Sequence, residues 1–186
     1  MATRPQTGLV YGDLQGFPED NLRREIINGE LIVTAAPSTR HQEVVLRLGA
    51  RLLLYVEEHG GRAYPAPTDV FFTEANVVEP DVVFVAEANI GKVEMRFVRS
   101  APDVVVEVSS PSTRRLELVR KRDLYERFGV PDYWYVDLEA ERIQLYRLTE
   151  DRYGLPLLLE RGDVLESPQI PGFTLQVGYV LGPSED

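Results

Sequence analysis

Apolar and polar residues alternate with two different periods along this 186-residue chain, and each period predicts a different element. Segment 24–33, REIINGELIV, places two apolar runs on either side of Asn28-Gly29, a strong signal for a β-hairpin. Residues 38–61 repeat apolar positions every three or four residues and end at Gly60-Gly61, which predicts a helix. Thr39 and Gln42 have the spacing of its capping box. The expected apolar stripe comprises His41, Val44, Val45, Leu48, Leu52, Tyr55 and Val56.

The middle of the chain predicts a mixed α/β sheet flanked by helices. Residues 103–109 form a near-continuous valine run, typical of a strand that is covered on both faces. The following segment, 110–128, predicts a helix with Ser110 or Ser112 as its cap, Pro111 in its first turn and Gly129 as its stop. Further strands are predicted within 62–73 and at 80–86, 132–138 and 142–148, with short strands between 155 and 180. The order from residue 38 is therefore αβββαβ, with a parallel pair on either side of the second helix.

One charged residue interrupts the valine strand. Side chains alternate along a strand, so Glu107 shares a face with Asp103 and Ser109. A buried carboxylate is costly unless a cation or a metal accompanies it. A structural salt bridge on a partly open face is the simpler interpretation of Glu107.

The helix after this strand also carries a charge on its apolar side. Helical geometry sets Lys121 in the middle of the stripe of Leu118, Leu124, Tyr125 and Phe128, and Glu117 shares this side. Because the helix directly follows the strand of Glu107, Lys121 can reach that carboxylate. Alternatively, Lys121 extends along the apolar surface to water.

Asp81 begins a strand that we expect to neighbour 103–109. Two carboxylates from adjacent strands, together with a lysine, suit a hard cation such as Mg²⁺ or Mn²⁺. The carboxylates would hold the metal, and the lysine would orient a water or offset negative charge. Taken alone, Pro-Asp at a strand entrance is ordinary turn chemistry.

Composition restricts the function less than these residues do. The formal net charge is −10, which disfavours contact with phosphate backbones, although residues 112–128 hold six basic against three acidic side chains. There is no cysteine, so thiolate chemistry is excluded. No segment resembles a signal peptide or a membrane span, which predicts a cytoplasmic protein without membrane contact.

The motifs EPDVVFV, APDVVVEVSSPST and GVPDYWYVD resemble those of a large bacterial family of proposed restriction endonucleases, Uma-two, in the PD-(D/E)XK nuclease superfamily. The resemblance runs from about Glu25 to Tyr146. It implies a single restriction-endonuclease-like domain over residues 1–186, with a core at about 38–148, an N-terminal hairpin and extra C-terminal strands.

The resemblance also implies roles for individual residues. Asp81, Glu107 and the Val108 backbone carbonyl would be metal ligands. Lys121 would be the lysine of the motif moved to the following helix, because Ser109 stands at its usual place. Glu117 stands where an aspartate is usual, and Asn28 replaces the aspartate of the usual hairpin. The second-rank site residues are Glu25, His41 and Glu117.

The leading hypothesis is therefore a Mg²⁺-dependent endonuclease that hydrolyses DNA and acts as a homodimer. A rival hypothesis is a catalytically inactive binding or assembly module whose acids and lysine form a buried salt bridge. The net charge and Ser109 favour this rival modestly. A third hypothesis is a phosphoesterase that acts on RNA or nucleotides.

Overall fold

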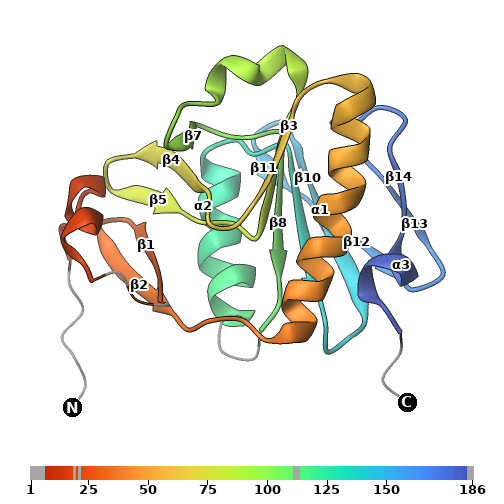
Figure 1. Ribbon diagram of the computed structural model, residues 1–186, viewed down its shortest axis with the longest axis horizontal. Coiled ribbons are helices and arrows are strands. Elements are labelled where there is room, and N and C mark those ends of the chain that lie inside the picture. Colours follow the sequence, from red (N-terminus) through yellow and green to blue (C-terminus); the bar gives the residue numbers. More distant parts are fainter. Residues whose placement is uncertain (1–6, 19, 21, 111–113, 184–186) are drawn as a thin grey trace.

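A seven-stranded mixed sheet forms the centre of the molecule in the computed structural model, which describes residues 7–18, 20, 22–110 and 114–183 (Figure 1). Its strand order is β11-β10-β9-β8-β6-β3, and β12 pairs with β10 as well. The strands are β3 (Arg62–Pro65), β6 (Val82–Val85), β8 (Val104–Val108), β9 (Asp132–Asp137), β10 (Arg142–Thr149), β11 (Arg152–Tyr153) and β12 (Leu157–Glu160).

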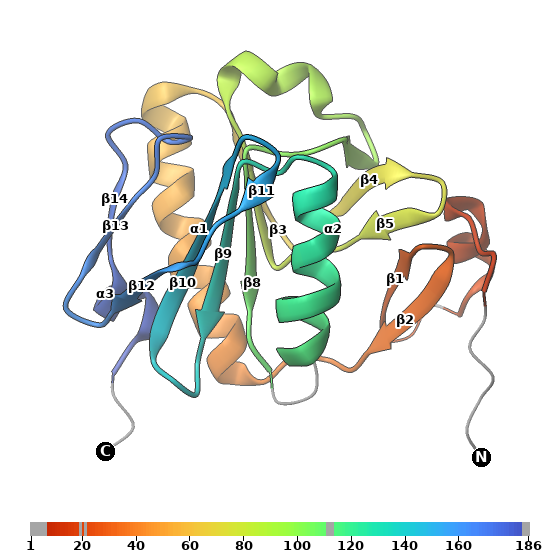
Figure 2. The ribbon, with the colours of Figure 1, turned by 180° about the vertical axis from the view of Figure 1, so that it is seen from behind.

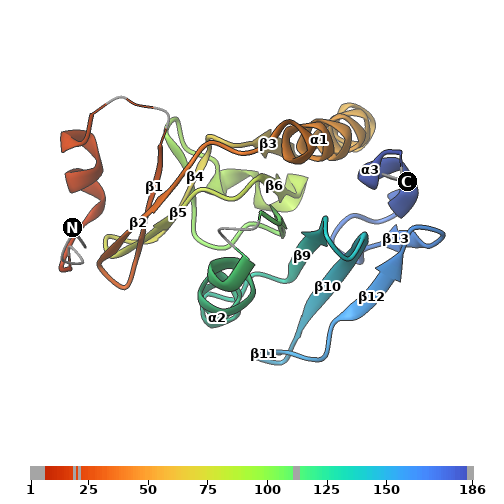
Figure 3. The same cartoon turned by 90° about the horizontal axis from the view of Figure 1, so that it is seen from below.

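Helices cover both faces of this sheet. Helix α1 (Thr39–His59) lies on one face, and the continuous helix formed by η3 (Leu116–Lys121) and α2 (Arg122–Arg127) lies on the other (Figures 2 and 3). Alternate valines of β8 enter the two separate cores. Val104, Val106 and Val108 pack with α1, and Val105 packs with α2. The valine run is therefore buried on both faces, as its lack of polar alternation predicts.

The predicted order αβββαβ is confirmed. It corresponds to α1, β3, β6, β8, α2 and β9. Strands β3, β6 and β8 are antiparallel neighbours, and β8 pairs with β9 in parallel. The crossover helix between β8 and β9 is what this parallel pairing requires.

A second, five-stranded sheet stands beside the first. Its strand order is β2-β1-β5-β4-β7. The strands are β1 (Arg23–Ile27), β2 (Glu30–Thr34), β4 (Asp69–Thr73), β5 (Asn76–Val78) and β7 (Phe97–Arg99). The hairpin predicted at Asn28-Gly29 is confirmed, and both turn residues adopt positive φ angles of 54° and 74°. Segment 62–73 divides between the two sheets, so its strands β3 and β4 do not form a hairpin with each other.

Two local predictions are corrected. The cap of α1 is Ser38, whose hydroxyl accepts a hydrogen bond from the backbone N–H of His41, and Thr39 is already helical. Residues 116–121 of the second helix are π-helical, which the sequence did not predict. Pro111 and Ser112, expected at the start of that helix, lie outside the described residues.

The remaining elements lie near the ends of the chain or in loops. The expected C-terminal strands are present as β13 (Val164–Glu166) and β14 (Thr174–Gln176), and a short helix α3 (Val177–Leu181) follows them. Two 3₁₀ segments, η1 (Tyr11–Gly16) and η2 (Glu87–Lys92), complete the described elements. Within the described ranges, no helix has both the length and the apolar character needed to cross a membrane.

Candidate active site

Asp81 and Glu107 face each other across two neighbouring strands. In the antiparallel register of β6 and β8, Val82 pairs with Val106. Continuing this register by one residue sets Asp81 opposite Glu107, with their side chains on the same face of the sheet. Directly opposed side chains in such a pair have Cβ atoms about 5 Å apart. Both residues are buried, with exposed fractions of 1% and 0%.

Three donors surround the carboxylate of Asp81. Its Oδ2 atom accepts hydrogen bonds from the backbone N–H of Val108 at 2.7 Å and from His41 Nε2 at 3.0 Å. Its Oδ1 atom accepts one from Arg23 Nη2 at 2.9 Å. Burial opposes ionisation, but the hydrogen bond from His41, the charge of Arg23 and the Val108 N–H outweigh it and lower the pKa of Asp81 to about 2. Asp81 is therefore an ionised carboxylate at neutral pH.

Glu107 is held by a lysine and a tyrosine. Its Oε1 atom accepts hydrogen bonds from Lys121 Nζ and from the Tyr125 hydroxyl, each at 2.5 Å. Its Oε2 atom is buried and has no hydrogen-bond partner among the described residues. Burial raises the pKa of Glu107 to about 7. The charge of Lys121 opposes this rise, but the negative charges of Asp81 and Glu25 offset much of its effect. Glu107 can therefore lose or take up a proton near neutral pH.

Lys121 is buried, and its amine joins two carboxylates. Its Nζ atom lies 2.7 Å from Glu25 Oε1 as well as 2.5 Å from Glu107 Oε1. Burial disfavours the ammonium form, but these two carboxylates outweigh burial and raise the pKa of Lys121 above its ordinary value. The alternative in which the lysine extends to water is excluded by its 1% exposed fraction.

The π-helical turn Leu116–Lys121 carries Lys121, the lysine of this site. The backbone N–H of Arg122 bonds to the carbonyl of Glu117, five residues earlier, and the turn ends at Lys121. Both Glu117 and Lys121 are buried on the side of the helix that packs against the sheet. Single π-turns in α-helices occur frequently at functional sites.

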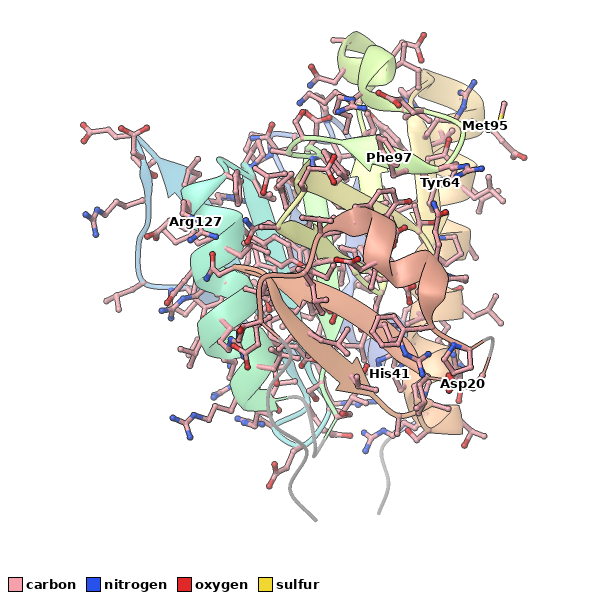
Figure 4. The ribbon with its side chains drawn as sticks, turned by 90° about the vertical axis from the view of Figure 1, so that its left-hand side faces the viewer. Asp20, His41, Tyr64, Met95, Phe97 and Arg127 are labelled. Carbon is pink, nitrogen blue, oxygen red and sulfur yellow. The ribbon has the colours of Figure 1, made fainter. Side chains whose placement is uncertain are left out.

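Strand β1 of the second sheet covers the site. Arg23 and Glu25 alternate onto one face of this strand, and Figure 4 looks onto the hairpin that contains it. Glu25 Oε1 accepts a hydrogen bond from the backbone N–H of Glu79, and Arg23 Nε lies 2.9 Å from Glu79 Oε1. Burial raises the pKa of Glu79 to about 7 despite Arg23. Arg23 and Glu79, with 20% and 18% of their side chains exposed, form the outer limit of the site.

The charges of the site do not balance. We call Glu25, Glu79, Asp81 and Glu107 the carboxylate cluster. When all four are ionised, Arg23 and Lys121 neutralise only two of them, which leaves an excess of two negative charges. A divalent cation would remove this excess. The unpartnered Oε2 atom of Glu107 offers a ligand oxygen for one.

The ligands present fit Mg²⁺ better than a metal held entirely by protein side chains. Within the described ranges, no three His, Asp or Glu side chains converge as a preformed metal cage. Mg²⁺ usually binds one or two carboxylates and fills its other positions with water and substrate phosphate. Asp81 and Glu107, with the Val108 carbonyl, could supply such a partial set.

The other residues considered from the sequence differ in their relation to this cluster. His41 contacts Asp81 directly, whereas the backbone carbonyl of the buried Glu117 accepts a hydrogen bond from the Tyr133 hydroxyl. Ser109 accepts a hydrogen bond from the backbone N–H of Leu138. Asp103 accepts bonds from the backbone N–H of Ala86 and the side chain of Asn89, so its role is to support the start of η2.

Three members of the site were missed by sequence reasoning, namely Arg23, Glu79 and Tyr125. Arg23 stands two residues before Glu25, so strand parity could have found it. Glu79 precedes Pro80-Asp81 directly. Tyr125 was assigned to the apolar stripe, and only its hydroxyl contact with Glu107 shows a polar role.

The basic segment is largely neutralised by acidic partners. Arg114 pairs with Asp137 through two hydrogen bonds, Arg120 pairs with Glu30, and Arg122 pairs with Asp123. A surface pocket of about 250 Å³ nevertheless opens where β8 ends. Its lining includes the guanidinium-bearing residues Arg40 and Arg114 and the hydroxyl-bearing residues Ser38, Ser109 and Ser110.

Comparisons with known proteins agree with this fold. Residues 11–178 match the Uma2 family, described as "Putative restriction endonuclease". A solved structure of a putative nuclease of DUF820 from Anabaena variabilis superimposes with a TM-score of 0.77 at 17% identity, covering 93% of this chain and 97% of that one. No curated protein sequence matches significantly. The fold is therefore restriction-endonuclease-like, and the chain belongs to the Uma2 family.

Proposed function

We propose that this protein is a metal-dependent nuclease that hydrolyses DNA phosphodiester bonds. The observation that carries the proposal is the position of Asp81, directly before β6, opposite Glu107 of β8 when the register of the two strands is continued by one residue, with the buried amine of Lys121 bonded to Glu107. Two carboxylates and a lysine in this relation can bind a hard cation and offset negative charge on a phosphate. Membership in the Uma2 family, described as "Putative restriction endonuclease", supports the same chemistry.

Some residues of the site would bind the metal ion, and others would position its ligands or the attacking water. Asp81 and Glu107 would hold the metal, with the Val108 carbonyl as a third ligand. A bound Mg²⁺ ion supplies Lewis-acid polarisation of a phosphoryl oxygen and a water of lowered pKa. The Val108 N–H and His41 keep the Asp81 carboxylate in place, and Tyr125 does the same for Glu107. Lys121 would orient the attacking water and offset developing charge.

The substrate must approach a chain whose overall charge is −10. The pocket beside the end of β8 is lined by Arg40, in the first turn of α1, and by Arg114, at the start of the second helix, and a phosphate backbone could lie there. Cutting both strands of a duplex requires two sites, so we propose that the working form is a homodimer. Its mass in solution, measured by light scattering, tests this assignment.

A non-catalytic module is the second candidate, because the cluster is almost closed to solvent. Lys121 already satisfies Glu25 and Glu107, as a purely structural ion pair would. In that case the fold would need the three residues for stability and not for chemistry. Loss of stability without any loss of metal binding or cleavage would favour this candidate.

Cleavage of supercoiled plasmid tests the proposed function. We expect nicked and linear products with Mg²⁺ or Mn²⁺, none with EDTA, and none from Asp81→Asn or Glu107→Gln. Asp103→Asn is the matched control, since it changes a buried aspartate of the other Pro-Asp motif outside the site. Parallel reactions with RNA and with nucleotide phosphodiesters distinguish a DNA nuclease from a phosphoesterase. Cleavage that persists in both site variants would contradict the proposal.

A further inference from the structure

The hydrogen-bond donors of the site are distributed unevenly over the two opposed carboxylates. Asp81 Oδ2 accepts two hydrogen bonds, from Val108 N and His41 Nε2. Glu107 Oε1 also accepts two, from Lys121 and Tyr125. An oxygen with two donors has little capacity left for a metal, because a carboxylate oxygen has two lone pairs. The oxygens that remain are Asp81 Oδ1 and Glu107 Oε2.

These two remaining oxygens are in different states. Glu107 Oε2 has no hydrogen-bond partner among the described residues. Asp81 Oδ1 has one partner, the Nη2 atom of Arg23 at 2.9 Å. The guanidinium of Arg23 therefore stands on the one oxygen of Asp81 that a cation shared with Glu107 would use.

Arg23 is also the partner of Asp81 that can move most easily. The Val108 donor is a backbone N–H within the sheet, and His41 is a buried side chain of α1. Arg23 is partly exposed, reaches the site from β1 and has a second anchor, Glu79 Oε1, at 2.9 Å from its Nε atom. If the bond to Asp81 breaks, the bond to Glu79 can keep the guanidinium at the entrance.

We propose that Arg23 is an internal cation that occupies Asp81 Oδ1 and is displaced when a divalent metal binds. The inference rests on the proposed function, because it concerns the same metal site. Before metal binding, Arg23 prevents Asp81 from becoming an uncompensated buried charge, which would be strongly destabilising. When the divalent metal ion binds, it replaces the Arg23 guanidinium as the cation on Asp81. Breaking the Arg23–Asp81 contact costs free energy, which lowers the apparent affinity for the metal.

Calorimetric titration with MnCl₂ tests the exchange in three proteins: the wild type, Arg23→Gln and Arg24→Gln. Arg24→Gln is the matched control because it removes the same charge from the adjacent position. The ion-pair partner of Arg24 is the exposed Asp20. We expect Arg23→Gln to bind Mn²⁺ about tenfold more tightly than the wild type, and Arg24→Gln to match the wild type. Equal or weaker binding by Arg23→Gln would overturn the proposal.

The results also separate this inference from the proposed function. If the wild type binds Mn²⁺ and cleaves DNA while Arg23→Gln gains no affinity, only the exchange is wrong. If neither protein binds Mn²⁺, both proposals fail. Binding by Arg23→Gln alone would support the exchange, because it would show that Arg23 closes the site.

A crystal structure of the wild type grown with MnCl₂ provides a test that does not depend on a variant folding. We expect Arg23 Nη2 to lie beyond hydrogen-bond distance, about 3.2 Å, from Asp81 Oδ1, with the contact to Glu79 retained. A bound Mn²⁺ ion beside an intact Arg23–Asp81 hydrogen bond would contradict the proposal.

Discussion

The amine of Lys121 lies 2.5 Å from Glu107 Oε1, and neither side chain reaches the surface of the protein. The lysine comes from a π-helical turn and the glutamate from the middle of a valine strand. A buried pair of this kind stabilises the fold only while both partners are present, because each compensates the charge of the other.

Removal of Lys121 should therefore cost stability. Lys121→Met leaves Glu107 and Glu25 without their shared cation, and we expect a loss of about 3 kcal/mol in the free energy of unfolding at pH 8. Urea denaturation measures this loss. Adding Glu107→Gln to the same chain should restore part of it, whereas a loss below about 1 kcal/mol in Lys121→Met would contradict the buried pairing.

The pH dependence of stability should follow the raised pKa values of Glu107 and Glu79. Both groups have an ordinary pKa of 4.5 and a pKa of about 7 in the folded protein. Between these values the folded protein binds more protons than the unfolded chain, so its stability falls as pH rises through this window. Asp81, with a pKa of about 2, acts oppositely, and its contribution is lost as pH falls from about 4 toward 2.

We accordingly expect the free energy of unfolding, without added metal, to be about 4 kcal/mol greater at pH 5.5 than at pH 8, about 2 kcal/mol from each group. Urea denaturation at the two pH values measures the difference. Glu107→Gln should reduce it, since the amide does not titrate. An unchanged pH dependence in this variant would assign the effect to other groups.

Metal binding should release protons near neutral pH. A cation bound to Glu107 favours its ionised form, so part of the population must lose a proton when binding occurs below about pH 7. Calorimetry in two buffers of different ionisation enthalpy should detect this release at pH 6 and little of it at pH 8.5. A binding heat independent of the buffer at pH 6 would contradict the raised pKa of Glu107.

Tyr125 should orient Glu107 through its hydroxyl group. Tyr125→Phe removes one of the two donors to Glu107 Oε1 and should cost about 1 kcal/mol of stability. It should also raise the pKa of Glu107 further, so that the pH at which cleavage reaches half its maximum moves upward. Tyr153→Phe is a control, because the Tyr153 hydroxyl donates to the backbone of Val130 away from the cluster. Equal pH profiles for the two variants would exclude an orienting role.

Much of the fold could be predicted from local patterns. The Asn28-Gly29 turn, the apolar stripe of α1 and the valine run of β8 each have a short-range signature, and their order determines the αβββαβ arrangement. The division of 62–73 between two sheets has no such signature, since it depends on which distant strands β3 and β4 meet. The cap of α1 was misplaced by one residue because Ser38 and Thr39 are both capable of capping.

The site could be predicted where one element decided the position of a side chain. Strand parity indicated Glu107, and helical position indicated that Lys121 points inward. Arg23 and Glu79 were missed because their contacts join the second sheet to the start of β6. The contact between Arg23 and Asp81 spans 58 residues of sequence, and the contact between Glu79 and Glu25 spans 54. The π-helical turn was missed because bonding over five residues requires no particular residue type.

The central claim is that Asp81 and Glu107 together hold one divalent metal ion. Titration of the wild type with Mn²⁺ tests it most directly, with Asp81→Asn and Glu107→Gln measured alongside. We predict saturable binding of one ion per chain in the wild type and loss of that binding in both variants. Circular dichroism verifies that each variant is folded. Absence of binding in the wild type, or undiminished binding in either variant, would contradict the claim.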